Sequence, residues 1–451
     1  MRITFHGAAD TVTGSRHLVH IGDRSILLDC GLFQGFKVHR ERNWLPPPPE
    51  LLRADAVVLS HAHLDHSGWL PALVKHGYRG PIYASPATRD LAEVLLLDSA
   101  HLQEEDAKRA NRYGYSRHAK ALPLYTQRDA QRALAHIVPL APGRDQRCGD
   151  VRIGLTPVGH LLGACAVTLA HRGERLVYSG DVGRSDDLLM PPPRPLPEAE
   201  VLLIESTYGN RAHPPEDAAA ALAQIVRETV RRGGSVLMPA FAVGRAQALM
   251  LVLQRLKAAG EIPAELPLYL DSPMAVQATA LYHQHRRLLR VGAREADHLS
   301  DGVHMISDVR QSMRLQRSRW PSVIISASGM ATGGRVLHHL KAMAPTDKHH
   351  IVFAGFQVGG SRGARLVAGA SEVKIHGEYV PVRAQVSQLQ GFSGHADSDE
   401  LMAWMRGLHQ PPRQTLVVHG EPDASDALRI RIQDELGWKV RVPQHGETVE
   451  A

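Results

Sequence analysis

A dense group of metal-binding side chains constrains the fold more than any other feature of this chain. The segment SHAHLDHSG, residues 60–68, holds His61, His63, Asp65 and His66. An apolar run, AVVL, precedes the group and an amphipathic run, WLPALV, follows it, which predicts a buried strand, a loop and a helix. Side chains two residues apart on strand-like backbone point the same way, so we expect His61 and His63 to share one cation. Asp65 and His66 are then available to a second cation, and imidazole with carboxylate suits Zn²⁺ and similar metals.

Four more residues of metal-binding type each follow an apolar, strand-like run. The runs are SILLDCG, PVGHLLG, VYSGDVG and TLVVHGE, and the residues are Asp29, His160, Asp181 and His419. Binding side chains are often carried on loops that a rigid sheet positions at one of its edges. We therefore expect these four side chains to lie near the histidine cluster.

The order of strand-like and helix-like runs predicts the domain organisation. Up to about Glu205 strands predominate, which favours a sandwich of two sheets covered by helices. Strands and helices then alternate, as in a parallel-sheet unit, and the earlier style returns from about Val386. We predict an α/β protein in which an α/β domain, residues 208–385, is inserted into a sandwich domain formed by residues 1–207 and 386–451.

Composition indicates which binding partners and which cellular compartment to expect. The net charge of +6 and the pI of about 9.3 suit a polyanionic partner, although a basic chain without such a partner fits the charge equally well. Aromatic residues make up only 5% of the chain, so extensive stacking of bases on aromatic rings is not expected. The three cysteines, Cys30, Cys148 and Cys165, are far apart, which indicates a reducing compartment. No segment resembles a membrane span, so we expect a soluble cytoplasmic protein without a membrane partner.

Nine sequence blocks, taken in order, resemble those of one protein family. They are HAHLDH, GHLLGA, SGDVGR, ESTYGNR, PAFAVGRAQ, LDSPMA, SGMATGGRVLHHL, GFSGHAD and VVHGE. The chain resembles the β-CASP nucleases of the metallo-β-lactamase fold, and in particular the bacterial and archaeal relatives of the endonuclease subunit of pre-mRNA 3′-end processing. The resemblance implies a metallo-β-lactamase αββα sandwich with an inserted β-CASP domain, and a ribonuclease that cuts RNA phosphodiester bonds.

The resemblance also implies a ligand set for two zinc ions, with Mn²⁺ as a substitute. One ion is held by His61, His63 and His160, the other by Asp65, His66 and His419, and Asp181 bridges both. Asp29 is expected to orient these ligands through hydrogen bonds. Two ions of this kind can share a hydroxide that attacks phosphorus and can clamp the phosphodiester.

Further residues carry catalytic and substrate-binding roles implied by the same resemblance. His395, in GFSGHAD, is the expected general acid, and Glu205 is its expected hydrogen-bond partner. Asp65 is also expected to be a catalytic residue. At position 419 the chain has histidine and so resembles the RNA-processing members of the family, whereas the DNA-repair members typically have valine. This resemblance favours RNA over DNA as the substrate. The substrate-binding residues are expected at a glycine-rich turn and beside the general acid: Ser328, Gly333, Gly334 and Ser393.

Two other functions fit the histidine cluster. One is a different two-metal hydrolase of the same fold, of thioesterase or lactonase type, and the other is a metal-bound RNA-binding scaffold without turnover. The resemblance also leads us to expect no KH RNA-binding module, because the nuclease fold starts at residue 2. Dimers are common in the family, so a homodimer is a further expectation that the sequence itself does not decide. The remaining histidine pairs are assigned to the surface or to packing: His338 with His339, His349 with His350, and His283 with His285.

Overall fold

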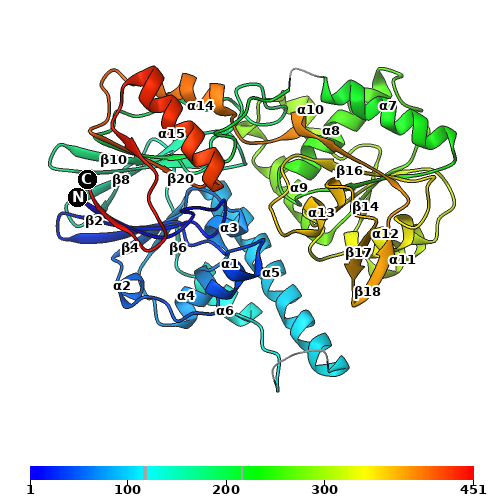
Figure 1. The fold of residues 1–451 in the computed structure, drawn as a ribbon, viewed down its shortest axis with the longest axis horizontal. Helices are drawn as coiled ribbons and strands as arrows, with labels where there is room; N and C mark the ends of the chain where they lie inside the picture. Colours follow the sequence, from blue (N-terminus) through cyan, green and yellow to red (C-terminus); the bar gives the residue numbers. More distant parts are fainter. Residues whose placement is uncertain (115–118, 215–216) are drawn as a thin grey trace. The chain divides into compact units, whose positions relative to one another are not determined.

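The structure, a computed structural model, describes residues 1–114, 119–214 and 217–451 and contains two compact units (Figure 1). The first unit combines Met1–Ala212 with His395–Ala451, and the second is His213–Gly394. The chain therefore leaves the first unit once and returns to it, as the sequence predicts for an inserted domain.

Two seven-stranded sheets form the first unit. One has the order β22-β1-β2-β3-β4-β5-β6, with β1 (Arg2–Gly7), β2 (Arg16–Ile21), β3 (Arg24–Leu28), β4 (Ala56–Val58), β5 (Ile82–Ala84), β6 (Ile137–Pro139) and β22 (Thr448–Glu450). The other has the order β21-β20-β11-β10-β9-β8-β7, with β7 (Gln146–Cys148), β8 (Val151–Pro157), β9 (Cys165–His171), β10 (Glu174–Tyr178), β11 (Val201–Glu205), β20 (Gln414–Val418) and β21 (Val440–Arg441).

A single apolar core joins the inner faces of these two sheets. Along β8, the buried side chains of Val151, Ile153 and Leu155 alternate with more exposed ones, as expected for a strand with one face on a core. They belong to the same cluster as Ile3 of β1 and Leu28 of β3, so residues of both sheets pack together. This packing fixes the strand ends from which the loops leave.

Helices cover the outer faces of the two sheets. The helices of this unit are α1 (Lys37–Arg42), α2 (Pro49–Leu52), α3 (Leu64–Ser67), α4 (Leu70–Lys75), α5 (Pro86–Tyr113), α6 (Gln127–Leu134), α14 (Ser398–Met405) and α15 (Pro422–Leu436). Helix α5 contacts β6 of one sheet and α15 contacts β20 of the other. Figure 1 shows α4 and α6 on one side of the strands and α14 and α15 on the opposite side. The predicted αββα sandwich is therefore confirmed.

The second unit is built on a parallel sheet of six strands in the order β14-β13-β15-β12-β16-β19. The strands are β12 (Val236–Pro239), β13 (Leu268–Asp271), β14 (Val303–Ile306), β15 (Val323–Ser326), β16 (His350–Ala354) and β19 (Gln385–Leu389), and a separate hairpin consists of β17 (Glu372–Ile375) and β18 (Glu378–Pro381). The helices are α7 (Ala218–Arg231), α8 (Arg245–Ala258), α9 (Pro273–Gln284), α10 (Ala293–Asp297), α11 (Val309–Gln316), α12 (Val336–Met343) and α13 (Arg362–Val367), with short 3₁₀ turns η1 (Arg286–Leu288) and η2 (Gln390–Phe392). This alternation of strands and helices is the pattern that the sequence predicts.

The unit boundaries differ from those expected from the sequence. Strand β19 (Gln385–Leu389) pairs in parallel with β16, so it extends the sheet of the second unit. The chain returns to the first unit at His395, later than the expected return at Val386. The difference arises because β19 is only half buried, so its sequence, QVSQL, resembles the amphipathic strands of the sandwich.

A buried polar network in the second unit was not expected from the sequence. Asp271, at the end of β13, lies 2.6 Å from His339 Nε2 and accepts hydrogen bonds from Ser312 Oγ at 2.6 Å and Arg335 Nη1 at 2.7 Å. Burial raises the pKa of Asp271, but its bonds to His339, Ser312 and Arg335 outweigh burial and lower that pKa overall. His339 is thus fully buried, as a packing role implies, but it is held by a carboxylate as well as by apolar neighbours.

None of the helices in the described ranges is both long enough and apolar enough to span a bilayer.

Candidate metal centre

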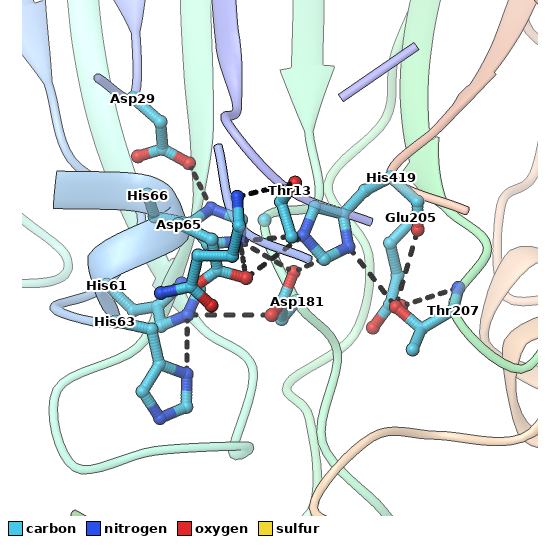
Figure 2. Close-up of polar contacts among 12 residues, drawn as sticks. Thr13, Asp29, His61, His63, Asp65, His66, Asp181, Glu205, Thr207 and His419 are labelled. Carbon is cyan, nitrogen blue, oxygen red and sulfur yellow. Dashed lines mark hydrogen bonds and ion pairs between the residues drawn. The ribbon is translucent and has the colours of Figure 1, made fainter. Parts of the chain in front are cut away.

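Seven side chains gather where the strands of the first unit end. His61 and His63 lie in the loop after β4, and Asp65 and His66 lie on α3, so the predicted strand, loop and helix are confirmed. The other three each follow a strand: His160 follows β8, Asp181 follows β10 and His419 follows β20. Figure 2 shows the α3 residues, Asp181 and His419 converging on one another.

The first set of ligand atoms comes from three histidines and one aspartate. His63 Nδ1 lies 3.1 Å from His61 Nε2 and 3.3 Å from His160 Nε2. Asp181 Oδ2 lies 3.5 Å from both His61 Nε2 and His160 Nε2. All four atoms fall within 4.8 Å of one another, so one cation could contact all of them.

The second set contains Asp65, His66 and His419. The Nε2 atoms of His66 and His419 are 3.0 Å apart, and Asp65 Oδ2 lies 3.6 Å from His419 Nε2 and 4.0 Å from His66 Nε2. Asp181 presents its other oxygen to this set, because Oδ1 is 3.2 Å from His66 Nε2. The two oxygens of Asp181 therefore face different sets (Figure 2).

The spacing and chemistry of both sets fit divalent zinc. Ligand atoms of a tetrahedral zinc site, with Zn–N distances of about 2.0–2.1 Å, lie about 3.4 Å apart. The closest contacts in both sets, between 3.0 and 3.5 Å, match that spacing. Imidazole nitrogens that face one another so closely can share a cation when both present a lone pair. The donor set is thus suitable for metal ions of the zinc type.

The ionisation of the cluster also suits a metal. Burial lowers the pKa of His61 well below its ordinary value and that of His63 to about 4, so both rings are neutral, as ligands must be. Burial raises the pKa of Asp65, but a hydrogen bond to His419 and the charge on His66 outweigh it and lower that pKa to about 2. Burial lowers the pKa of His66, but the Asp181 and Asp29 carboxylates outweigh it and hold that pKa well above its ordinary value. This part of the cluster therefore attracts positive charge.

Asp29 lies behind the cluster and fixes two of its members. Its Oδ2 is 2.7 Å from His66 Nδ1 and accepts hydrogen bonds from Ser60 Oγ at 2.7 Å and Tyr178 Oη at 2.8 Å, while Oδ1 accepts from the Ser60 amide. Ser60 Oγ in turn lies 3.1 Å from His61 Nδ1. The carboxylate leaves His66 Nε2 facing the cluster.

Three residues at the site hold a backbone conformation that is unusual for side chains other than glycine. The φ angles of Asp29, His160 and His419 are 57°, 53° and 52°. Left-handed backbone at a strand end turns the side chain sharply away from the strand direction, and it is a strain commonly found at functional sites. Ordinary strand geometry would aim these side chains elsewhere.

His395 and Glu205 form a pair beside the first set. His395 Nδ1 lies 3.2 Å from Glu205 Oε1, and His395 Nε2 lies 3.9 Å from Asp181 Oδ2. Glu205 is fully buried and also accepts from the Val182 amide at 2.7 Å. Burial lowers the pKa of His395, but Glu205 and Asp181 outweigh it and raise that pKa above its ordinary value. The pair therefore favours a protonated imidazole ring close to the cluster.

The expected substrate-binding residues belong to the other unit, and the turn that carries most of them is internally bonded. Ser328 Oγ accepts hydrogen bonds from the amides of Thr332, at 3.0 Å, and Gly333, at 3.3 Å. Gly334 has a φ of +77°, and a side chain there would approach the Ala327 carbonyl oxygen at 2.8 Å. The turn thus satisfies its own amides, and an anion could use those of Thr332 and Gly333 only by displacing the Ser328 hydroxyl. Ser393 is buried and follows the 3₁₀ turn η2.

Supporting residues around the cluster were not found from the sequence. Thr207 Oγ1 lies 3.2 Å from His419 Nδ1, and Tyr178 contacts Asp29 from the opposite sheet. The position of Thr207 two residues after Glu205, in ESTYG, is a weak signal for such a role, while Tyr178 looks like an ordinary strand residue.

The fold and the site define the class of this protein. An αββα sandwich with histidines and aspartates gathered at the strand ends is the arrangement of metallo-β-lactamase-type, metal-binding hydrolases. Residues 12–232 match the metallo-beta-lactamase superfamily, residues 246–366 the beta-Casp domain, and residues 379–443 the Zn-dependent metallo-hydrolase RNA specificity domain. The chain belongs to the β-CASP family of the metallo-β-lactamase superfamily, which confirms the resemblance found in the sequence.

Named relatives cover most or all of the chain. Ribonuclease TTHA0252 of Thermus thermophilus is 39% identical over 459 residues and covers 100% of both chains. Transcription termination factor FttA of Methanocaldococcus jannaschii is 33% identical and covers 95% of this chain and 69% of its own length. A solved structure from Enterococcus faecalis, titled as a protein of unknown function, superposes with a TM-score of 0.56 at 15% identity and covers 99% of both chains. That last likeness concerns the fold alone.

Proposed function

We propose that this protein is a metal-dependent ribonuclease that hydrolyses RNA phosphodiester bonds at a centre of two zinc ions, in RNA processing or decay. The observation that carries the proposal is the position of Asp181, whose two oxygens face two separate sets of imidazole and carboxylate ligands. Mn²⁺ could replace Zn²⁺ at such a centre, since the donors are nitrogen and oxygen.

Each ion has its own ligands in this proposal. His61, His63 and His160 would hold one ion, Asp65, His66 and His419 would hold the other, and Asp181 would contact both. When bound, such ions lower the pKa of water and neutralise charge on the oxygens of a phosphodiester. The chain itself positions the ligands, because Asp29 contacts Nδ1 of His66 and Thr207 contacts Nδ1 of His419, while the Nε2 atoms of the two rings lie 3.0 Å apart.

His395 is proposed to donate a proton to the leaving oxygen. Its Nε2 is directed toward Asp181 and hence toward the metal ligands, while Nδ1 is held by Glu205. A buried carboxylate that is bonded to one ring nitrogen orients the other and favours the protonated ring. Loss of a phosphodiester linkage produces an alkoxide, which is a poor leaving group unless it is protonated.

Two features favour RNA hydrolysis over the alternatives. A thioester hydrolase has no need of a leaving-group acid such as His395, because a thiolate departs without a proton. A relative named as a ribonuclease is 39% identical over the whole chain, which favours RNA over a lactone as the substrate. A scaffold without turnover has no need of an intact set of metal ligands, and each expected ligand is present here. Two further statements stay predictions. One is that the chain forms a homodimer, and the other is that substrate is bound by Ser328, Gly333, Gly334 and Ser393.

A direct assay tests this proposal. RNA labelled at the 5′ or 3′ end, the same sequence as DNA, and a thioester are each incubated with the purified chain, and bound metal is measured on the same preparation. We expect cleavage of RNA, little cleavage of DNA, no thioester turnover and close to two metal ions per chain. The His63→Ala variant should fold but not cleave. Thioester turnover faster than RNA cleavage, or equal cleavage by the variant, would contradict the proposal.

Replacing Asp29 with alanine is expected to weaken metal binding rather than abolish it. The change removes the carboxylate that orients His66 and Ser60, and loss of such a group typically lowers metal affinity by about 10- to 100-fold. The measurement is a competition between the chain and a chromophoric chelator. Asp55→Ala is a matched control, because Asp55 also accepts hydrogen bonds from a serine, Ser25, but from none of the seven proposed ligands. Equal affinities for both variants would contradict the role of Asp29.

A further inference from the structure

An exposed segment of the second unit combines arginines with a tryptophan. Residues 309–320 read VRQSMRLQRSRW and contain four arginines and no acidic residue. Helix α11 forms most of this segment, beside α12 and near the β17–β18 hairpin in Figure 1. We give the name arginine–tryptophan face to seven of its exposed residues: Val309, Arg310, Met313, Arg314, Arg317, Arg319 and Trp320.

The buried side of α11 fixes which residues point outward. Ser312 and Leu315 are buried, and Ser312 donates its hydroxyl to the buried Asp271 carboxylate at 2.6 Å. Arg310, Arg314 and Arg317, spaced by four and three residues, share the exposed side. The helix is therefore anchored with a row of guanidinium groups toward solvent.

These arginines are not neutralised by neighbouring acids. No carboxylate in the described ranges lies within ion-pair distance of Arg310, Arg314, Arg317 or Arg319. The nearest acid in sequence, Asp308, accepts hydrogen bonds from the amides of Arg310 and Gln311 at the helix start. Other arginines of the same unit are paired, namely Arg227 with Glu261, Arg255 with Glu295 and Arg286 with Asp297. The face thus carries a local excess of positive charge.

Trp320 gives this charged face a rigid aromatic surface. Its exposed fraction of 79% is the highest among the large apolar side chains in the described part of the chain, and Met313 and Val309 are 47% and 62% exposed. Its backbone is held, since its amide donates to Ser318 Oγ at 3.3 Å and its carbonyl accepts from Ser235 Oγ at 3.4 Å. Core strand β15 begins shortly after it, at Val323. A tryptophan so exposed on an anchored backbone indicates a binding surface.

We infer that the arginine–tryptophan face binds single-stranded RNA, with phosphates on the arginines and a base stacked on Trp320. Proteins that bind single strands combine a positive surface with aromatic side chains in this way. A two-fold contact between copies of the chain would bring like charges together, which disfavours self-association through this face. The choice of RNA as the polyanion rests on the proposed ribonuclease function.

Two sets of variants of the full chain test this inference. The first replaces Arg310, Arg314 and Arg317 with alanine, and the second replaces Trp320 with alanine or phenylalanine. Binding of a fluorescent oligouridine RNA is measured in a His395→Ala background, which keeps the RNA intact. The logarithm of RNA affinity falls as the logarithm of salt concentration rises, and each phosphate contact to a single strand steepens this fall by about 0.7. We therefore expect the triple variant to make the slope shallower by about 2. Trp320→Ala should weaken binding about tenfold. Trp320→Phe should retain most of the affinity but lose the part of the intrinsic tryptophan fluorescence that RNA binding quenches.

Matched controls separate this site from general electrostatics. A triple alanine variant at Arg227, Arg255 and Arg286 removes the same charge from the same unit, and Trp44, 59% exposed, is the control for Trp320. Equal losses in test and control variants would overturn the inference, as would unchanged affinity in both test variants. A change of oligomeric state without a change in RNA affinity would identify a protein interface instead. RNA cleavage by the chain with His395 intact is scored separately. If the chain does not cleave RNA but the face variants lower its affinity for RNA, only the proposed function is refuted. If the chain cleaves RNA but the face variants leave its affinity for RNA unchanged, only this inference is refuted.

Discussion

The Asp181→Ala variant is expected to lose RNA cleavage almost completely and to retain less metal than the unmodified chain. Among the described residues, Asp181 is the one whose oxygens face both ligand sets, at 3.5 Å from His61 and 3.2 Å from His66. Removal of an outer residue that only orients a ligand typically costs about 10- to 100-fold in metal affinity or activity, so removal of a shared ligand should exceed about 100-fold. Metal analysis of the purified variant and its initial rate on labelled RNA provide the measurement.

Asp186→Ala is the matched control for this variant. Asp186 lies in the same loop but is exposed and pairs only with Arg184 among the described residues. It should keep both metal and activity. Thermal unfolding of the metal-free forms distinguishes a lost site from a lost fold. If Asp181→Ala kept two ions and cleaved RNA at a normal rate, the proposed centre would be wrong.

The His395→Ala variant is expected to bind metal normally and to cleave RNA about 10²- to 10⁴-fold more slowly, the usual contribution of a positioned general acid. The deficit should be much smaller on a phosphodiester with a nitrophenyl leaving group, because that group departs without a proton. Glu205→Gln should show the same pattern with a smaller effect, since the amide can still contact His395 but carries no charge. Rates on both substrates, with metal content, form the test.

A second histidine–glutamate pair of the same unit provides the control. His409 Nδ1 lies 2.6 Å from Glu198 Oε1, but its side chain is 89% exposed and it contacts none of the proposed ligands. His409→Ala should therefore cleave both substrates normally. An equal deficit of His395→Ala on RNA and on the nitrophenyl substrate would show that His395 does not protonate the leaving oxygen.

Local pattern and family resemblance each predicted a different part of the site. The strand–loop–helix around His61, His63, Asp65 and His66 followed from hydrophobic pattern, because the segment is short and continuous. The nearness of His160, Asp181 and His419 to that cluster followed from their positions after apolar runs. Which of them joins which set depended on the resemblance, since spacing along a chain does not say how loops from different strands meet.

Other features could not be predicted because they depend on contacts distant in sequence. Asp271 and His339 are 68 residues apart, and the helix pattern RVLHHLKAM gives no sign that its second histidine meets a buried carboxylate. Strand β19 was assigned to the wrong side of the boundary because half-buried strands look alike in either unit. The exposure of Trp320 runs against the usual burial of tryptophan, and the low aromatic content of the chain made base stacking look unimportant.

The left-handed backbone of Asp29, His160 and His419 has a consequence for engineering this enzyme. A left-handed conformation costs a residue with a side chain about 1 kcal/mol, and glycine would adopt it freely. Screens for thermostable variants should therefore tend to select glycine at His160 and His419 and remove a proposed metal ligand in doing so, whereas glycine at Asp29 would leave Ser60 and Tyr178 without their acceptor. The same positions could be recognised in advance as places where heat resistance and turnover oppose each other.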